Sequence, residues 1–302
     1  GKSIMRNAFI EGLCSYARES SDVILLVADL GYSVVEPFAD QFPERFYNCG
    51  VAEQNMAGVA AGMASEGCHV FTYSIANFPT FRCAEQIRND IDYHNVPVTT
   101  VAVGGGLAYG NMGYSHHAIQ DLALMRLFPN HVICAPADAQ EVFACMDFLS
   151  NAPQPSYLRL GRNDSFSCHN SKPTLEIGHW NFCFGNPSST KIFLATGGGV
   201  AIARNLLNGD SRYQDWGVYS LPLWGMKFKK DQAKKILDSL ELIVTVEDHI
   251  EDGGFGSWFK ESLSDVCLDK TKIKSINLSS RVSSEVGSQD YLLNKYLNIP
   301  CF

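Results

Sequence analysis

Short apolar runs alternate with helix-like segments along nearly the whole chain, and this alternation constrains the fold more than any other feature. The run Asp22–Asp29 is short, continuous and apolar, as expected for a strand buried on both faces of a sheet. Further strands are predicted at 69–73, 98–103, 131–135 and 156–160, and helices at 51–65, 80–92, 119–127 and 139–150. This order predicts an α/β fold, a mostly parallel sheet flanked by helices.

The composition changes at 161–187, which is rich in Asn, Ser, Gly and Pro and suits an interdomain linker with room for a hairpin. A second α/β unit is predicted after it, with strands at 191–196, 216–221, 242–247 and 272–278 and helices at 200–207, 231–237 and 254–264. We therefore expect two domains, at 1–165 and 188–302, joined by a linker at 166–187.

Composition restricts the class of protein without identifying it. The chain has 302 residues, of which 46% are hydrophobic, as in a globular protein with a substantial core. The net charge of −8, without a basic stripe, argues against a nucleic-acid partner. No apolar stretch approaches the roughly 18–20 residues of a membrane span, and the first residues lack the pattern of a secretion signal. We expect a cytoplasmic protein that binds neither membranes nor nucleic acid.

The chain has 10 cysteines, most of them in apolar runs. No pair has Cys-x-x-Cys spacing, and cysteine–histidine pairs at the spacing of a zinc site are missing. A disulfide scaffold is not expected in a chain of this size. The sequence thus predicts reduced thiols that serve as small core residues, and no metal site in this chain.

Asp29 ends the first predicted strand. A polar residue at the carboxyl end of a parallel strand lies where α/β proteins bind ligands. Because aspartate also caps helices and forms turns, this position by itself supports either interpretation.

Glu53 begins a predicted helix whose other residues are mostly small or apolar. A glutamate in a first helical turn ordinarily complements the helix dipole. This helix surface, however, is nearly bare, which allows another backbone or subunit to approach closely and to bury the carboxylate. A buried carboxylate is suited to proton transfer. The small residues in question are Gly50, Ala57, Gly58, Ala60, Ala61 and Gly62.

Phe78 and Phe81 precede another predicted helix. Either ring could simply belong to the core. The alternative is an aromatic face on which a planar heterocycle stacks.

A glycine-rich loop follows the predicted strand 98–103 and ends at His116 and His117. The glycines permit a tight or mobile backbone, but no Gly-Lys-Ser/Thr follows, so the loop is not a phosphate-binding P-loop. Adjacent histidines point in different directions. We therefore expect one of them in a site and the other to be structural or exposed.

Two glycine-rich segments follow strands of the second unit. Thr196–Gly199 lacks the complete Gly-x-Gly-x-x-Gly pattern and the acidic residue of a dinucleotide site, so its glycines are expected to let the next helix pack closely. Glu247–His249, before Gly253–Gly256, ends a strand and could face a subunit boundary.

Together these segments resemble the C-terminal half of transketolase. They are also similar to deoxyxylulose-phosphate synthase and to the β subunits of 2-oxoacid dehydrogenases. The resemblance covers nearly the whole chain in the same order, and Gly50–Met56, similar to G-(I/V)-x-E-x-x-M, is its most specific part. The other matching segments are Val27–Leu30 (ADL), Asn77–Arg88 (aromatic residues and AxxxxR), Gly113–His116 (GxTH, with Ser115 for threonine), Leu124–Asn130 and Ala135–Asp138 (LxxxRxxPN…xPxD), Leu160–Arg162 (LSR) and Glu247–Gly256 (E(D/E)H…GGxG).

The resemblance implies thiamine diphosphate as the cofactor. Glu53 is then the residue that hydrogen-bonds N1′ of the aminopyrimidine, where proton exchange activates C2 of the thiazolium ring. Phe78 or Phe81 stacks on the pyrimidine, and Asp29 and Arg82 complete the implied cofactor-binding set.

The resemblance also implies a substrate site. His116 contacts substrate oxygens and assists proton transfer, so Glu53 and His116 form the implied catalytic set. The further residues of the implied substrate site are His117, Arg162, Asn111 and Met112.

A part of the family's site is missing from this chain. Family enzymes bind the diphosphate through Mg²⁺, using a Gly-Asp-Gly motif and a later Asn. The only Gly-Asp pair here is Gly209–Asp210, and its surroundings do not fit that motif. The resemblance therefore implies a separate N-terminal subunit that anchors the diphosphate and Mg²⁺, with the active site between chains in an α2β2 heterotetramer.

Two departures from the family concern the substrate. Where sugar transketolases carry an aspartate that recognises a sugar hydroxyl, this chain has Asn111 or Met112. Removal of a hydrogen-bonding charge changes hydroxyl selectivity sharply. The family's His-Pro pair is replaced by Val96–Pro97, which leaves Arg162 as the candidate for binding a substrate phosphate.

Three functions remain open at this point. The first is a split transketolase that moves a two-carbon ketol unit from a ketose or its phosphate to an aldehyde, in the metabolism of an unusual sugar or in secondary biosynthesis. The second is the β subunit of a 2-oxoacid dehydrogenase, which passes an acyl group to a lipoyl carrier. The third is a subunit that keeps the fold without activity. Gly113–His116 favours the first, and Glu53 argues against the third.

Overall fold

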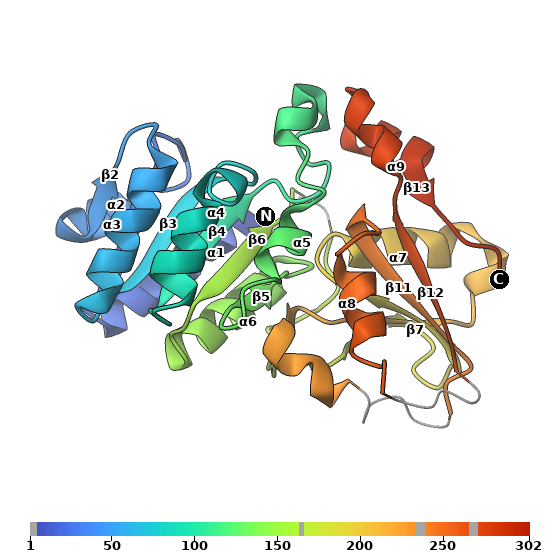
Figure 1. Cartoon of the computed structure of the whole chain (residues 1–302). Helices are drawn as coiled ribbons and strands as arrows, with labels where there is room; N and C mark the ends of the chain where they lie inside the picture. Colours follow the sequence, from blue (N-terminus) through green and yellow to red (C-terminus); the bar gives the residue numbers. More distant parts are fainter. Residues whose placement is uncertain (1–4, 163–165, 233–238, 266–270) are drawn as a thin grey trace.

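Two mostly parallel sheets, each flanked by helices, form the fold, and this confirms the predicted fold class (Figure 1). The computed structural model describes residues 5–162, 166–232, 239–265 and 271–302. The first sheet and its helices lie on the left of Figure 1, and the second sheet lies on the right.

The first sheet has seven strands in the order β10-β5-β6-β4-β3-β1-β2. All neighbours are parallel except β10, which comes from the second half of the chain and runs antiparallel to β5. The central strands are buried along their whole length, as their continuous apolar runs predicted. The bounds are β1 (Val23–Val27), β2 (Phe46–Asn48), β3 (His69–Ile75), β4 (Val98–Val103), β5 (Val132–Cys134), β6 (Ser156–Leu160) and β10 (Leu223–Trp224).

Helices cover both faces of this sheet. On one face lie α1 (Met5–Glu19), α2 (Glu36–Gln41) and α6 (Ala139–Asn151). On the other lie α3 (Glu53–Ser65), α4 (Ala84–Gln86) and α5 (Asp121–Met125). The helix expected at 80–92 is formed as three successive turns of different pitch, a 3₁₀ turn at Phe81–Cys83, then α4, then a π-helical turn at Ile87–Asp92.

The second sheet has six strands in the order β13-β12-β11-β8-β9-β7. The four inner strands are parallel, and both edge strands run antiparallel to their neighbours. Its strands are β7 (Asn181–Gly185), β8 (Lys191–Ala195), β9 (Gly217–Ser220), β11 (Leu242–Ile250), β12 (Lys272–Leu278) and β13 (Leu297–Asn298), and its helices are α7 (Gly199–Gly209), α8 (Phe255–Glu261) and α9 (Gln289–Tyr296). Most of the helix expected at 231–237 lies outside the described residues.

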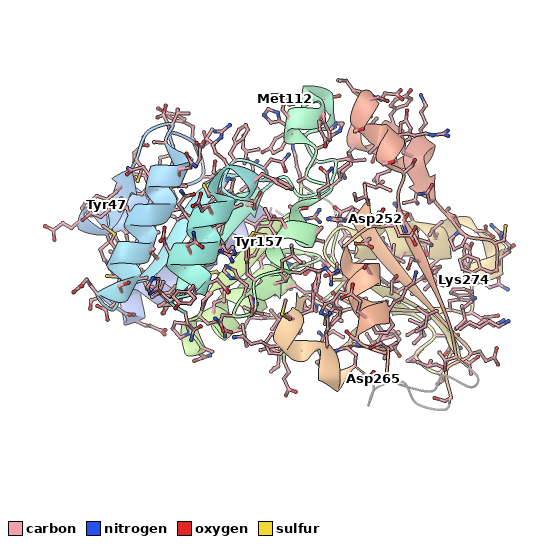
Figure 2. All side chains as sticks on the ribbon, in the orientation of Figure 1. Tyr47, Met112, Tyr157, Asp252, Asp265 and Lys274 are labelled. Carbon is pink, nitrogen blue, oxygen red and sulfur yellow. The ribbon has the colours of Figure 1, made fainter. Side chains whose placement is uncertain are left out.

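A buried ionic network joins the two sheets. Arg159, on β6, donates from Nε to Asp121 Oδ2 over 2.7 Å and from Nη1 to Asp248, which lies on β11. Tyr157, labelled near the centre of Figure 2, donates its hydroxyl to the same oxygen of Asp121. The three charged side chains are almost completely enclosed, so each depends on the others for its partners.

Among the described residues, no helix is both long and apolar enough to cross a membrane.

Candidate functional site

The carboxyl ends of four neighbouring strands meet at one edge of the first sheet, in the order β4-β3-β1-β2. Asn48 ends β2, and its Oδ1 accepts hydrogen bonds from the backbone N–H groups of Asp29 and Gly50, each over 2.9 Å. Asn48 therefore ties the end of β1 to the turn that leads into α3. Asp29 itself is exposed and has a positive φ of 55°, a conformation that aspartate tolerates better than most residues.

Glu53 is the first residue of α3, and its side chain is buried. Its Oε2 accepts a hydrogen bond from Arg82 Nη1 over 2.9 Å, which pairs the charge that burial would otherwise leave uncompensated. The interpretation of Glu53 as a mere helix-dipole residue explains neither its burial nor this partner.

Phe78 lies beside this ion pair. The guanidinium carbon of Arg82 is 4.6 Å from the centroid of the Phe78 ring. The rings of Phe78 and His116 meet edge to face, with their centroids 5.4 Å apart. Phe81, in contrast, is exposed. Glu53, Arg82, Phe78 and His116 thus form a continuous row at this edge of the sheet.

Asn77 fixes the loop that carries His116. Its Nδ2 donates to the carbonyl oxygens of Ser115 and His117, each over 3.0 Å. His116 Nδ1 lies 2.9 Å from Ser115 Oγ, and its ring stays partly exposed. His117 is buried with Nε2 directed at the carbonyl of Gly110, so His116 is the one of the two histidines that is open to a substrate.

The same loop requires glycine at one position. Gly104 has a φ of +91°, and a Cβ there would lie 2.2 Å from the ring of Tyr109. That close approach places Tyr109 with its centroid 6.4 Å from that of His116. The centroid of the Tyr109 ring lies 5.8 Å from the guanidinium carbon of Arg162. The row therefore continues from His116 through Tyr109 to Arg162.

Asn111 and Met112 lie in a short 3₁₀ turn, Gly110–Met112, and both are exposed. Figure 2 labels Met112 at the top of the molecule, where this turn projects beside the C-terminal segment. Gly110 holds the turn there, because its carbonyl accepts from the N–H of Gly287 and a Cβ would lie 2.6 Å from the Gly287 carbonyl oxygen.

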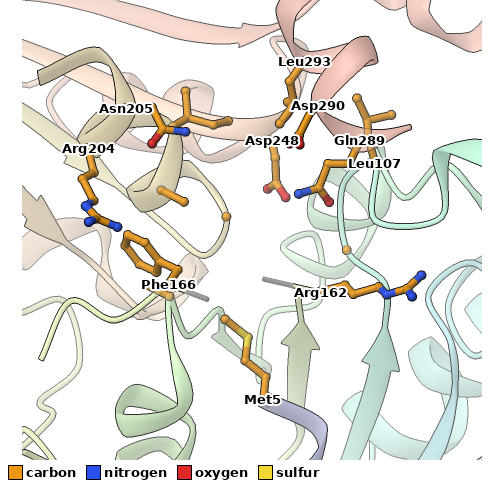
Figure 3. Close-up of a pocket in the computed structure, with 16 residues that line it drawn as sticks. Met5, Leu107, Arg162, Phe166, Arg204, Asn205, Asp248, Gln289, Asp290 and Leu293 are labelled. Atoms are coloured by element: carbon orange, nitrogen blue, oxygen red, sulfur yellow. The ribbon is translucent and has the colours of Figure 1, made fainter. Parts of the chain in front are cut away.

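A cavity of about 260 Å³ lies between the two sheets, next to the end of the row (Figure 3). Arg162 lines it, but its guanidinium points away from the centre, whereas the carboxylate of Asp248 points inward. Arg204 also lines the cavity, with its guanidinium carbon 5.6 Å from the Phe166 ring centroid.

Glu247, Asp248 and His249 do not face the outside of the chain, where a subunit boundary was considered. All three are buried at the junction of the two sheets. Glu247 accepts the N–H groups of Phe255 and Gly256 at the start of α8, although burial raises the pKa of its carboxyl to about 8. Burial lowers the pKa of His249 to about 4. These residues therefore serve the joint between the sheets.

The predicted site residues are brought together in part. Glu53, Arg82, Phe78, His116 and Arg162 form one row, Asp29 lies next to it at the end of β1, and Phe81, Asn111 and Met112 are exposed around it. Asn77, which fixes the loop, was not among the predicted site residues. A polar side chain two residues beyond the buried strand β3 was the available signal. Around Glu53, the described residues form no cluster of potential metal ligands.

Comparison with known proteins points to a single family. The transketolase pyrimidine-binding domain family matches residues 2–166. A protein described as a transketolase C-terminal section, from Methanocaldococcus jannaschii, is 33% identical over 97% of this chain and 91% of its own length. A subunit of the apulose-4-phosphate transketolase of Phocaeicola vulgatus is 30% identical over 86% of this chain and 83% of its own length.

A solved structure supports the same relationship. A split-gene transketolase, described as an inactive β4 tetramer, superposes with a TM-score of 0.82 and 30% sequence identity. The match covers 98% of this chain and 93% of the other, so both sheets and their connection are shared.

Proposed function

Because the chain belongs to the transketolase family, we propose that it is the C-terminal subunit of a two-component enzyme that transfers a two-carbon ketol unit from a ketose or ketose phosphate to an aldehyde. It is a thiamine-diphosphate-dependent transferase subunit that acts with a partner subunit. The observation that carries the proposal is the buried carboxylate of Glu53 beside an aromatic ring at the carboxyl edge of a parallel sheet.

The residues at this edge fit the pyrimidine ring of the cofactor. Glu53 offers a buried acceptor, and Phe78 offers a partly exposed ring face. The planar guanidinium of Arg82 donates a hydrogen bond to Glu53 and lies over the ring of Phe78. A protonated aminopyrimidine would make the same two contacts. Bound thiamine diphosphate supplies a carbon nucleophile that adds to the carbonyl of the donor.

The protein groups have separate roles in this scheme. Glu53 would hydrogen-bond N1′ of a bound pyrimidine and move a proton between its buried carboxyl group and that nitrogen. Phe78 orients the ring. His116, fixed by Asn77 and Ser115, donates hydrogen bonds to substrate oxygens and moves a proton there.

The diphosphate and Mg²⁺ belong to the partner subunit in this proposal. The chain lacks the family's Gly-Asp-Gly motif, and the relative from Phocaeicola vulgatus is named as one subunit of its enzyme. The outer side of α3 supports a facing subunit, since a Cβ at Gly58 or Gly62 would meet nothing within 4 Å. Large apolar side chains around the same edge are also exposed, namely Tyr32, Tyr47, Val51 and Phe81. We propose an α2β2 assembly.

The proposed substrate is a sugar that ordinary pentose-phosphate enzymes do not favour. In this proposal Asn111 or Met112 takes the place of the aspartate with which sugar transketolases recognise a hydroxyl. Arg162, at the end of the row, is the proposed contact for a substrate phosphate. The name of the apulose-4-phosphate transketolase likewise refers to a phosphorylated sugar.

The proposed domains remain 1–165 and 188–302, joined by a linker at 166–187. Strand β7 lies within this linker and forms an edge of the second sheet.

The proposal is tested by reconstitution with the candidate partner, a chain that carries the Gly-Asp-Gly motif and the later Asn. The mixture with Mg²⁺ and thiamine diphosphate should exchange the C2 proton of the cofactor, as followed by NMR, and should transfer ketol units in a screen of donors and acceptors. Glu53→Gln should assemble normally and lose about 10²–10⁴-fold in exchange rate, the usual contribution of a general acid–base group. Glu66→Gln, an exposed glutamate at the end of the same helix, is the matched control.

Normal exchange in the Glu53→Gln assembly would remove the assignment of Glu53. Acyl transfer to a lipoyl carrier, without ketol transfer, would replace the proposed reaction by that of a 2-oxoacid dehydrogenase.

A further inference from the structure

Four side chains that commonly bind metals converge at a place outside the row around Glu53. Glu141 comes from α6, Cys168 and His169 from the segment between the sheets, and Cys183 from β7. One ligand atom from each lies within 4.8 Å of all the others. Within 5–162, 166–232, 239–265 and 271–302, this is the one such group.

The spacing of these atoms is close to that of a tetrahedral zinc site. His169 Nε2 lies 3.0 Å from Glu141 Oε1 and 3.9 Å from Cys183 Sγ. Zinc bonds of about 2.0 Å to nitrogen or oxygen and about 2.3 Å to sulfur put neighbouring ligand atoms roughly 3.3–3.8 Å apart. A small adjustment around the common centre would therefore complete the geometry.

Glu141 is already oriented as a ligand would be. The residue is completely buried, and its Oε2 accepts from the backbone N–H of Ala137 over 2.7 Å and from Ser220 Oγ over 3.1 Å. Oε1 is left to face His169. Hydrogen bonds to the non-ligating oxygen are the usual means of fixing a carboxylate ligand.

Asp138 positions three of the four residues. Its Oδ1 caps α6 by accepting the N–H of Glu141 over 2.9 Å. Its Oδ2 accepts the N–H of Cys168 over 2.8 Å and that of His169 over 3.2 Å. One buried carboxylate thus holds the Cys168–His169 pair against the start of the helix that carries Glu141.

Cys183 reaches the cluster through an irregularity in its strand. The register between β7 and β9 passes from Phe182 opposite Tyr219 to Phe184 opposite Val218, which leaves Cys183 without a partner residue. An extra residue of this kind re-aims a side chain at the expense of the regular hydrogen-bond ladder. Here it directs the thiol toward His169.

We propose that Glu141, Cys168, His169 and Cys183 bind one Zn²⁺ ion in a closed, structural site. Two thiolates, an imidazole and a carboxylate are all ligands that zinc accepts, and four protein ligands leave no open coordination position. Binding releases to solvent the protons on the ligating atoms, so that Cys168 and Cys183 bind as thiolates and His169 as a neutral imidazole. Because the ligands come from α6 and from β7, the ion would clamp the first sheet's helix to the edge of the second sheet.

The test begins with the full chain, purified under reducing conditions without chelator. We expect one equivalent of zinc by plasma mass spectrometry. After removal of zinc, titration with Co²⁺ should produce a thiolate-to-cobalt charge-transfer band and a d–d spectrum typical of tetrahedral coordination, and Zn²⁺ should displace the cobalt. The melting temperature should fall when zinc is removed and recover when it is restored.

Substitutions then identify the ligands. Cys168→Ser and Cys183→Ser should each weaken zinc binding by more than about 100-fold, beyond the ~10–100-fold typical of outer-shell losses. Cys68→Ser, at another half-buried free thiol, should change nothing. If a variant does not fold, the cobalt spectrum of the unsubstituted chain still decides. Absence of both the zinc and the charge-transfer band would overturn the proposal.

Discussion

Arg82 donates from Nη1 to Oε2 of Glu53 over 2.9 Å, and the pair combines an exposed residue with an enclosed one. The side chain of Arg82 is 47% exposed, whereas that of Glu53 is 3% exposed. The guanidinium therefore covers the carboxylate from the solvent side. Because it also lies over Phe78, it occupies the space that we propose for the pyrimidine ring.

Arg82→Ala should strengthen binding of thiamine diphosphate to the assembled enzyme. The substitution vacates the proposed pyrimidine position and leaves Glu53 in need of a donor, which the bound ring provides. We expect a gain of a few-fold in affinity, since half-exposed ion pairs contribute up to about 1 kcal/mol. Fluorescence titration measures it, with the exposed Arg88→Ala as control. Weaker binding would instead show that Arg82 contacts the bound cofactor directly.

Phe78→Ala should weaken cofactor binding more than Phe81→Ala. Phe78 lies between Arg82 and His116, whereas Phe81 is 46% exposed. Loss of an aromatic stacking contact costs about 0.5–1.5 kcal/mol, so the cofactor dissociation constant should rise by up to about tenfold for Phe78→Ala. Equal effects would leave open which ring stacks on the pyrimidine, and a larger effect at Phe81 would assign the role to that ring.

Long strands buried on both faces could be predicted from the sequence because their own composition determines them. The run at 98–103 became β4 with the same bounds, and 156–160 became β6. The edge strands β2 and β7 could not, since Phe46–Asn48 and Asn181–Gly185 are partly exposed and owe their conformation to pairing with β1 and β9.

The candidate site shows the same division. Glu53 stood out through the small residues of its helix and a family motif, but its partner Arg82 lies 29 residues away and no local spacing links them. Similarly, Glu141, Cys168 and Cys183 approach one another through tertiary packing. Spacing rules for zinc sites assume pairs of ligands on one short segment. The four residues of this cluster come from three segments, so no spacing pattern in the sequence pointed to a metal site.

Arg159→Leu should destabilise the chain strongly. It leaves Asp121 and Asp248 buried without their common partner, and breaking a buried ion pair from one side costs about 3–5 kcal/mol. Urea unfolding of the full chain should show the loss. Arg212→Leu, which breaks an exposed pair with Asp210, should change stability far less than Arg159→Leu does. Similar stabilities for both variants would mean that the buried network does not join the sheets.

Glu261 should make stability depend on acid pH. Hydrogen bonds from Arg126, on the first sheet's side, hold the pKa of this α8 carboxyl at about 2, below its ordinary value of 4.5. A carboxyl whose pKa is depressed by folding stabilises the folded state fully above its unfolded pKa, and the contribution disappears as pH falls through the folded pKa. The difference in unfolding free energy between the unsubstituted chain and Glu261→Gln should therefore stay constant above about pH 5 and shrink between about pH 4.5 and pH 2. Glu251→Gln, which removes an exposed pair with Lys260, is the control and should show no such change. If the difference in unfolding free energy for Glu261→Gln stayed constant down to pH 3, the contact with Arg126 would not form in solution.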